Sequence, residues 1–215
     1  MRMMRTDIDM RKFIRGYFAE IRWKAFPSDI RSKLRILPGV EQADRERFFL
    51  NSSYQFSEKD LQSYSAPYQY RGVTYFFPYR LGYQEAKGRP KGEVQKVINL
   101  CMLTRHSDGF VREKAVVEIF LYSDHFTFYP FVIPYILRLL GEYVNEISEQ
   151  IYNHRELLPK KELKQFCGEN KRFLEQTRQR AISYWDCNYR QQGLKLKDVP
   201  AIRFFDWLGV LLQGN

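Results

Sequence analysis

The chain has 215 residues, of which 44% are hydrophobic and 28% charged, and its formal net charge is +10 at pH 7. This composition predicts a folded core and excludes a wholly disordered chain. The three cysteines are far apart and form no Cys-x-x-Cys pair, so we expect neither a metal site nor a cofactor, and a reducing, cytoplasmic environment. The first residues lack a secretory signal and no apolar run reaches about 18 residues, so we expect a soluble protein that does not cross a membrane.

The positive charge is concentrated at the two ends of the chain. Residues 1–47 and residues 155–215 each hold twelve basic and seven acidic residues, whereas residues 48–154 hold eleven of each kind. This asymmetry favours acidic partners that meet the flanking segments.

Residues 1–91 are predicted to hold short helices followed by an irregular segment. Residues 7–25 have an apolar face with helical periodicity, and Pro27 ends that element before a shorter helix over 30–37. Residues 48–83 are crowded with Tyr and Phe but are repeatedly broken by Pro and Gly. We expect this segment to pack as a cap over the helices; a small β-hairpin is the alternative.

Residues 92–215 are predicted to be helical. The apolar spacing indicates one helical hairpin from residue 93 to about residue 120 and another from about residue 131 to residue 153. A long polar helix over about 159–185 and an apolar helix over 198–212 follow. The expected fold class is therefore all-α, with residues 1–91 and 92–215 forming one continuous domain.

The turn inside the first hairpin carries the most specific motif. Asp108 and Gly109 open its second helix, and Val111, Arg112 and Ala115 follow at helical spacing. Asp108 can accept hydrogen bonds from the first backbone amides, and small side chains one turn apart allow close helix packing. This pattern resembles that of HEAT repeats, an armadillo-like family of helical hairpins.

A weaker copy follows 33 residues later, where Val144 takes the place of Val111 and Asn145 that of Arg112. The resemblance covers about residues 92–154 and implies a short α–α superhelix with atypical flanking helices and a concave contact surface. It also implies that Arg112 bonds to the neighbouring repeat. Two repeats fall below the usual minimum of about three, so either the flanking helices cover the ends or the chain belongs to a larger assembly.

Two sets of basic residues are candidates for binding an anionic partner. Such strips can bind phosphates, but charged residues also occupy the solvent side of amphipathic helices, and acidic neighbours dilute their field. The candidates lie on one strip of the first helix and at seven-residue intervals of the long polar helix: Arg11, Arg15 and Arg22, and Lys164, Lys171 and Arg178.

The sequence shows no nucleophile motif, phosphate loop or metal-ligand spacing, which indicates no catalytic residue and favours a non-enzymatic protein without deciding the point. Our first hypothesis is a HEAT-like interaction or scaffold protein with a protein partner. The alternative is a nucleic-acid-binding protein, of which a HEAT-type DNA glycosylase is the most specific form. Such a glycosylase would need aromatic rings that stabilise a cationic modified base and a carboxylate that faces the DNA. The candidates are the pair Trp185 and Asp186 and the pair Asp206 and Trp207.

Overall fold

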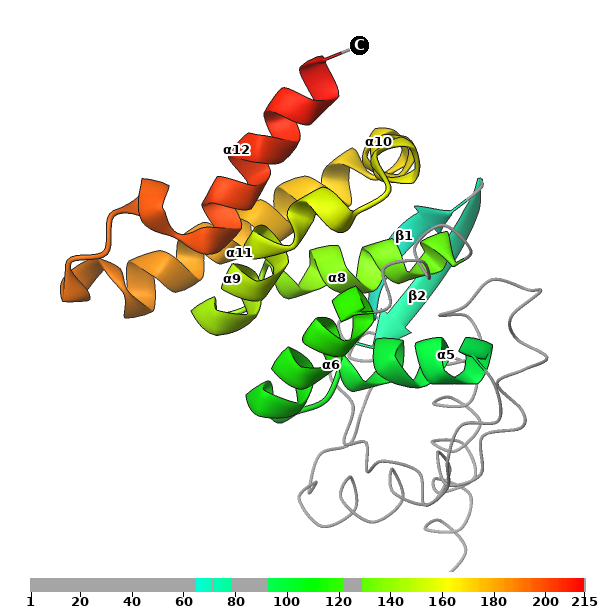
Figure 1. Cartoon of the computed structure of the whole chain (residues 1–215). Helices are drawn as coiled ribbons and strands as arrows, with labels where there is room; N and C mark the ends of the chain where they lie inside the picture. Colours follow the sequence, from blue (N-terminus) through cyan, green and yellow to red (C-terminus); the bar gives the residue numbers. More distant parts are fainter. Residues whose placement is uncertain (1–64, 71, 79–92, 122–128, 215) are drawn as a thin grey trace, which may run out of the picture.

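The computed structural model describes residues 65–70, 72–78, 93–121 and 129–214. Within these ranges the chain is mostly helical, as the sequence predicts, and its strands form one antiparallel pair (Figure 1). The helices expected over 7–25 and 30–37 lie outside the described residues. In chain order the elements are β1 (Ser65–Tyr70), β2 (Val73–Pro78), α5 (Glu93–Leu103), α6 (Gly109–Leu121), α8 (Ile133–Leu139), α9 (Asn145–Asn153), α10 (Lys160–Glu169), α11 (Lys171–Asn188) and α12 (Pro200–Gln213), with short 3-10 helices at Pro130–Val132, Arg155–Leu157, Arg190–Gln192 and Leu196–Asp198.

The aromatic segment is not irregular throughout, because residues 65–78 form a β-hairpin. β1 and β2 pair with Tyr70 opposite Val73, which leaves a two-residue turn. Gly72 in that turn has φ +73°, a left-handed conformation that only glycine adopts readily. Proline is tolerated in the hairpin because both strands of a two-stranded sheet are edges. The prediction of an irregular segment is therefore wrong over these residues, and the alternative of a small hairpin is correct.

The helical hairpins pack as successive pairs. α5 packs against α6, α6 against α9, and α9 against α12, so these helices follow one another across the molecule (Figure 1). α8 lies inside, where it contacts α9, α10 and α11, and all of its residues are buried. The core contributed by these helices includes Val97, Ile98, Cys101, Val116, Ile119, Ile136, Leu137, Ile147, Ile151 and Phe204.

The last helix, predicted over 198–212, is observed as α12. It buries Ile202, Phe204 and Leu208 and packs against α9, α10 and α11. Each large apolar side chain that is fully removed from water contributes about 1.5–3 kcal/mol to stability. α12 therefore covers the earlier helices as part of the fold. None of the helices in the described ranges has the combined length and apolarity that a membrane span requires.

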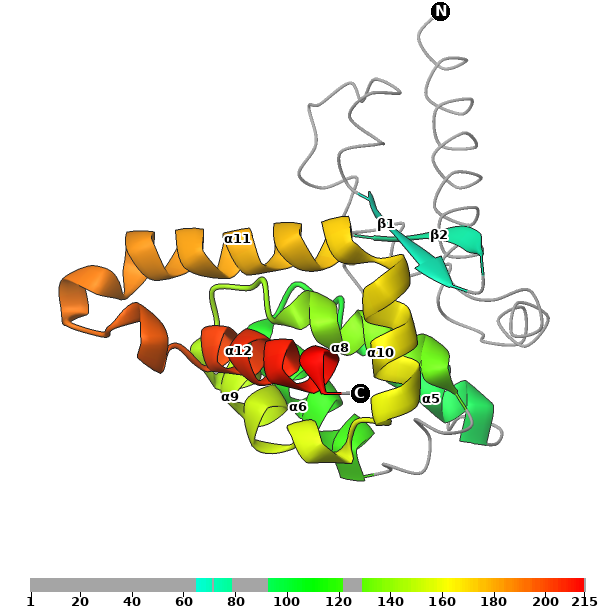
Figure 2. The same ribbon diagram turned by 90° about the horizontal axis from the view of Figure 1, so that it is seen from above.

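The polar helix expected over 159–185 is broken in two at Asn170. α10 and α11 meet there at a sharp bend (Figure 2). The Oδ1 atom of Asn170 accepts a hydrogen bond from the Gln69 amide at 2.6 Å, and its Nδ2 atom donates to the carbonyls of Gln69 and Phe166, both at 2.9 Å. The prediction of one helix is wrong because an asparagine side chain competes with the helical backbone, and β1 satisfies it at the break.

These hydrogen bonds attach the β-hairpin to the helices. Tyr68, next to Gln69, is only 1% exposed, and its ring centre lies 6.2 Å from that of Phe166 on α10. The described part of the aromatic segment thus contributes the side chain of Tyr68 to the core.

The turn between α8 and α9 approaches α11 closely at Gly141. A Cβ atom on Gly141 would lie 3.1 Å from both the Cγ2 atom and the carbonyl oxygen of Thr177. Thr177 is fully buried and its hydroxyl donates to the carbonyl of Phe173 at 2.8 Å, so it has little room to move. The lack of space therefore requires glycine at this position. The backbone conformation does not require it, because Gly141 is not among the glycines with a positive φ angle.

We predict that Gly141→Ala lowers the free energy of unfolding by about 1–3 kcal/mol, because the added methyl group must push α11 away. Gly168→Ala is the matched control, since no atom lies within 4 Å of a Cβ added at this helical glycine of α10. The control should raise the free energy of unfolding by up to about 1 kcal/mol through helix propensity. Urea denaturation followed by circular dichroism measures both changes, and equal effects would contradict the close contact at Gly141.

Candidate functional site

The turn with the HEAT-like motif is held by local hydrogen bonds. α6 begins at Gly109, and the Oδ1 atom of Asp108 accepts a hydrogen bond from the Phe110 amide at 2.9 Å, so Asp108 caps this helix. The Asp108 amide donates to the Nδ1 atom of His106, also at 2.9 Å. These contacts are those of a capped turn and not of an acid–base pair.

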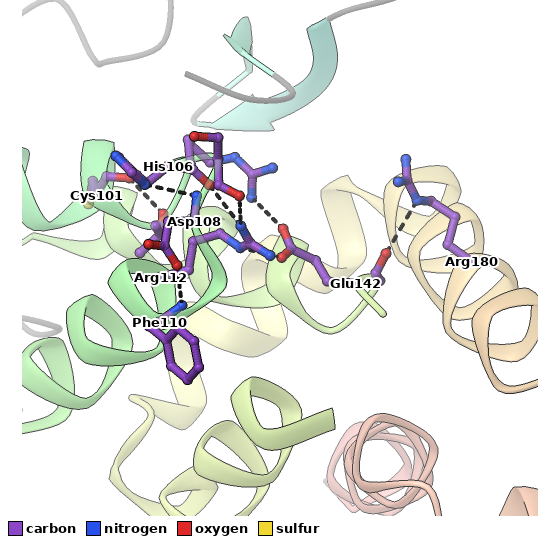
Figure 3. A network of polar contacts seen from close by, with 11 residues as sticks. Cys101, His106, Asp108, Phe110, Arg112, Glu142 and Arg180 are labelled. Carbon is purple, nitrogen blue, oxygen red and sulfur yellow. Dashed lines mark hydrogen bonds and ion pairs between the residues drawn. The ribbon is translucent and has the colours of Figure 1, made fainter. Parts of the chain in front are cut away.

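Arg112 points from this turn into the interior and joins the two helical hairpins (Figure 3). Its side chain is fully buried, and its Nε atom lies 2.6 Å from the Oε2 atom of Glu142. Its Nη1 atom donates to the carbonyls of His106 and Ser107 at 2.8 and 2.9 Å. Arg105, which follows α5 and is also fully buried, lies 3.4 Å from the Oε1 atom of Glu142. The carboxylate of Glu142, from the second hairpin, thus forms ion pairs with two arginines of the first.

The weaker copy of the motif is out of register with the structure. α9 begins at Asn145, so Val144 directly precedes that helix, as Asp108 directly precedes α6. Counted from the two helix starts, Ser148 and not Asn145 occupies the position of Arg112. The second copy of the motif therefore has no arginine at the position of Arg112. It contributes Glu142 to the contact between the two hairpins.

The other motif residues pack around the same junction. Ala115 is buried on α6 and Val111 is half-buried there. A Cβ atom added at Gly109 would lie 3.6 Å from the Cγ2 atom of Val144, so Val144 lies against the start of α6 although it is outside α9. Burial of Ala115 and the contact of Val144 place these residues in the packing between the two hairpins.

The basic residues predicted to bind an anion do not form one strip. Lys164 lies on α10, where its Nζ atom donates to the carbonyl of Gly214. Lys171 and Arg178 are exposed on α11, beyond the bend at Asn170. The strip assumed one continuous helix, and the break interrupts it between Lys164 and Lys171, whereas Lys171 and Arg178 share α11. Binding of an anion by these residues stays a prediction. The other candidates, Arg11, Arg15 and Arg22, lie outside the described residues.

A groove of about 740 Å³ runs beside α11. β1 closes it at the α10–α11 bend, and the end of α8 contributes to its wall; Figure 2 shows β1 beside the start of α11. Arginine and amide side chains are prominent in its lining. The lining residues are Tyr68 and Gln69 from β1, Arg138 from α8, and Glu169, Asn170, Arg172, Phe173, Gln176, Gln179, Arg180 and Ser183 from the bend and α11.

Among the described residues of its lining, the charged ones are Arg138, Arg172 and Arg180 and the carboxylate of Glu169. Arg138 is only 7% exposed, and its guanidinium carbon lies 6.0 Å from the centre of the Phe173 ring. The Nε atom of Arg180 donates to the carbonyl of Gly141 at 3.3 Å, a contact drawn in Figure 3. Packed neighbours therefore position two of the guanidinium groups, whereas Arg172 is exposed near the start of α11.

The groove lies on a different face of α11 from the one that carries Lys171 and Arg178. A helix turns by about 100° per residue, which places Lys171 and Arg178 about 120–140° from the centre of the groove-lining face. Sequence reasoning missed the groove because β1 and α8 supply part of its wall. The available signal was a row of polar residues at helical spacing: Arg172, Gln176, Gln179 and Ser183.

Other chemically interesting side chains are engaged in packing. The Nε1 atom of Trp185 donates to the carbonyl of Leu194 at 2.8 Å, and that of Trp207 donates to Glu156 at 2.9 Å. Burial raises the pKa of the Cys167 thiol to about 12, so this thiol stays protonated and unreactive near neutral pH. In the part of the chain that the structure describes, no three His, Cys, Asp or Glu side chains gather in a way that could hold a metal ion.

Comparison of this chain with protein-family models, with curated proteins and with solved structures finds no match.

We predict that Arg112→Ala lowers the free energy of unfolding by about 3–5 kcal/mol, because the buried carboxylate of Glu142 loses its nearer counter-ion. Lys114→Ala, at an exposed position of the same helix, should change it by no more than about 0.5 kcal/mol. Chemical denaturation of both variants tests this. A loss below about 1 kcal/mol for Arg112→Ala would show that the two hairpins do not depend on this ion pair.

We predict that Asn170→Ala releases β1 from the helix bend, because the two hydrogen bonds between the side-chain amide and the backbone of Gln69 are lost. The backbone amide of Gln69 should then exchange with solvent at least about tenfold faster, as measured by NMR-detected hydrogen exchange. Asn188→Ala is the control, since it removes a bond from the Asn188 amide to the Tyr184 carbonyl within α11. Unchanged protection of Gln69 in Asn170→Ala would contradict the anchoring role.

Proposed function

We propose that this chain is a non-enzymatic interaction module that binds another macromolecule along the groove beside α11. The observation that carries the proposal is the groove itself, a concave volume of about 740 Å³ lined by arginine and amide side chains. Pockets of this size bury ligands and use a few polar groups to orient them. The exposed side chains of Arg172, Gln176 and Gln179 line the groove and can form hydrogen bonds with a ligand.

The packing of the helices supports a HEAT-like array as the scaffold of this module. α5 with α6 and α8 with α9 are successive hairpins, and α6, α9 and α12 pack in a row (Figure 1). α11 with α12 takes the place of a third pair, because α11 contacts α8 while α12 contacts α9. Three pairs reach the number that such arrays usually need for stability, about three.

The side chains of the groove and the free cysteines indicate which class of partner and which cellular compartment the proposal favours. A protein partner is our first choice and a nucleic acid is the competing one, since arginine pairs with carboxylates and phosphates alike. The free cysteines Cys101, Cys167 and Cys187 support a reducing compartment such as the cytoplasm.

The proposal predicts that charge reversal inside the groove, and not elsewhere on α11, abolishes binding. The full-length chain is immobilised and exposed separately to random-sequence peptides and to random-sequence single-stranded oligonucleotides, and the retained fraction is measured. Arg172→Glu should reduce retention of the bound class by roughly tenfold or more, because a charged hydrogen bond is lost and a repulsive charge is added. Arg178→Glu makes the same change in net charge on another face of α11 and should retain the wild-type level.

Retention of neither class by the wild-type chain would refute the proposal. Equal losses in Arg172→Glu and Arg178→Glu would refute it as well, because binding would then follow the net charge of the chain and not the groove.

A further inference from the structure

We infer that the region where the end of α9 meets α12 is a second docking surface, which binds a helix of a partner protein through a carboxylate and adjacent apolar side chains. We call it the α9–α12 surface; it consists of Tyr152, Arg155, Leu157, Arg203, Trp207 and Val210. None of these residues lines the groove beside α11, so the α9–α12 surface is separate from the site of the proposed function.

Two arginines from different elements share the ring of Tyr152. Tyr152 lies on α9, which packs against α12 (Figure 1). The guanidinium carbons of Arg155 and of Arg203, the latter on α12, each lie 4.2 Å from the centre of that ring. The Nη2 atom of Arg203 also donates a hydrogen bond to the Tyr152 hydroxyl at 3.1 Å. These contacts hold the guanidinium of Arg203 in place, so less side-chain entropy is lost when it binds a ligand.

Arg203 differs from Arg155 in having no carboxylate beside it. The Nε atom of Arg155 lies 3.8 Å from the Oε1 atom of Glu156, and its Nη1 atom donates to the Tyr152 carbonyl at 2.8 Å. Arg203 is exposed and forms no ion pair with any carboxylate in the described part of the chain. Two cations on one ring repel each other, and a carboxylate bound to Arg203 would offset this repulsion. The free donors of a guanidinium match a carboxylate in geometry as well as in charge.

Apolar side chains continue the α9–α12 surface along α12. Trp207 and Val210 follow Arg203 by about one and two turns, so the three lie on one face of this helix. The Nε1 atom of Trp207 donates to Glu156 at 2.9 Å, which places this face beside the 3-10 helix Arg155–Leu157. Val210 is 72% exposed and Leu157 is 47% exposed. Tryptophan, tyrosine and arginine are the residues that most often dominate the binding energy of protein interfaces.

A second helix matches the spacing of this row. A helical turn rises about 5.4 Å, so a partner helix packed along α12 can place a carboxylate at Arg203 and apolar side chains one and two turns farther on. Those apolar side chains would cover Trp207 and Val210, which is the way amphipathic helices bind to apolar surfaces of other proteins.

The α9–α12 surface is less suited to a nucleic acid. A nucleic acid carries a phosphate on every nucleotide, and the exposed carboxylates of Glu156 and Asp206 would repel the phosphates next to the one at Arg203. A helix can instead present a single carboxylate among neutral side chains. Bases also need a free aromatic face, whereas the Tyr152 ring is in contact with two guanidinium groups.

Fluorescence anisotropy with the full-length chain tests the inference at near-physiological ionic strength. The probe is a labelled alanine-rich peptide of about fifteen residues, long enough to form a helix, with one Glu followed by a Leu after one turn and another after two turns. In one comparison peptide Gln replaces the Glu, and in another Ala replaces both Leu. The probe should bind at least about tenfold more tightly than either comparison peptide.

Two variants of the chain locate the contact. Arg203→Gln should weaken binding of the probe by about tenfold, because a hydrogen bond between charged groups is lost. Val210→Ala should weaken it by several-fold through the loss of apolar contact. Arg178→Gln and Arg172→Gln remove the same charge from exposed positions of α11, the second of them in the groove, and should stay within about twofold of the wild type.

Other outcomes would overturn the inference. Equal binding of the Gln peptide, or unchanged binding by Arg203→Gln, would contradict the carboxylate contact. A loss in Arg172→Gln without a loss in Arg203→Gln would place the peptide in the groove, which supports the proposed function and not a second surface. Binding of single-stranded oligothymidylate that Arg203→Gln abolishes, without binding of the peptide, would identify a nucleic-acid site. Absence of peptide binding by the wild-type chain would overturn the inference, while the retention assay on the groove decides the proposed function separately.

Discussion

One buried carboxylate holds the helical part of this protein together. Glu142 is 7% exposed and lies between Arg105 and Arg112, both of which are fully buried. Removing a charged group from water costs several kcal/mol, so each arginine requires a partner in the interior. The trio has one more positive than negative charge, and Arg112 also donates hydrogen bonds to the backbone carbonyls of His106 and Ser107. Because the trio joins buried residues of both hairpins, it connects the first hairpin to the second in the interior.

The same turn also determines where the groove lies. Gly141, the neighbour of Glu142, sits against Thr177 so closely that a side chain would not fit, and its carbonyl accepts a hydrogen bond from Arg180. The carbonyl of Tyr143, two residues after Gly141, accepts one from the hydroxyl of Tyr189. Consecutive residues of one turn therefore contact the first hairpin on one side and α11 on the other (Figure 3). A change in the orientation of the hairpins would move the groove-lining face of α11 relative to Arg138.

The predictions that were correct depend on signals local in the sequence. Apolar periodicity places the helical hairpins, and the observed α5, α6, α8 and α9 fall within the predicted spans. The capping role expected of Asp108 needs only the residues that follow it, and the hydrogen bond to the Phe110 amide is present. The partner of Arg112 was expected in the neighbouring hairpin, where it lies, but periodicity does not identify it as Glu142.

The predictions that were wrong concern residues whose conformation depends on distant partners. Residues around Asn170 have the composition of a continuous helix, but the backbone of Gln69, distant in the sequence, occupies the asparagine side chain and the helix breaks. That break also separates Lys164 on α10 from Lys171 and Arg178 on α11. The β-hairpin could be proposed only as an alternative, because its frequent prolines and glycines lower strand propensity, whereas burial of Tyr68 against Phe166 favours it.

The sequence by itself determined the mostly helical class, the hairpins between residues 93 and 153, the capped turn at Asp108 and the apolar last helix. Each follows from hydrogen bonds and side-chain periodicity within about one or two turns of a helix. Only the tertiary structure decided that Glu142 is the counter-ion of Arg112, that the polar helix bends at Asn170, and that β1, α8 and α11 enclose one groove. These features arise where segments far apart in the chain satisfy one another's buried charges and polar groups, and such pairing becomes visible only when the segments are brought together.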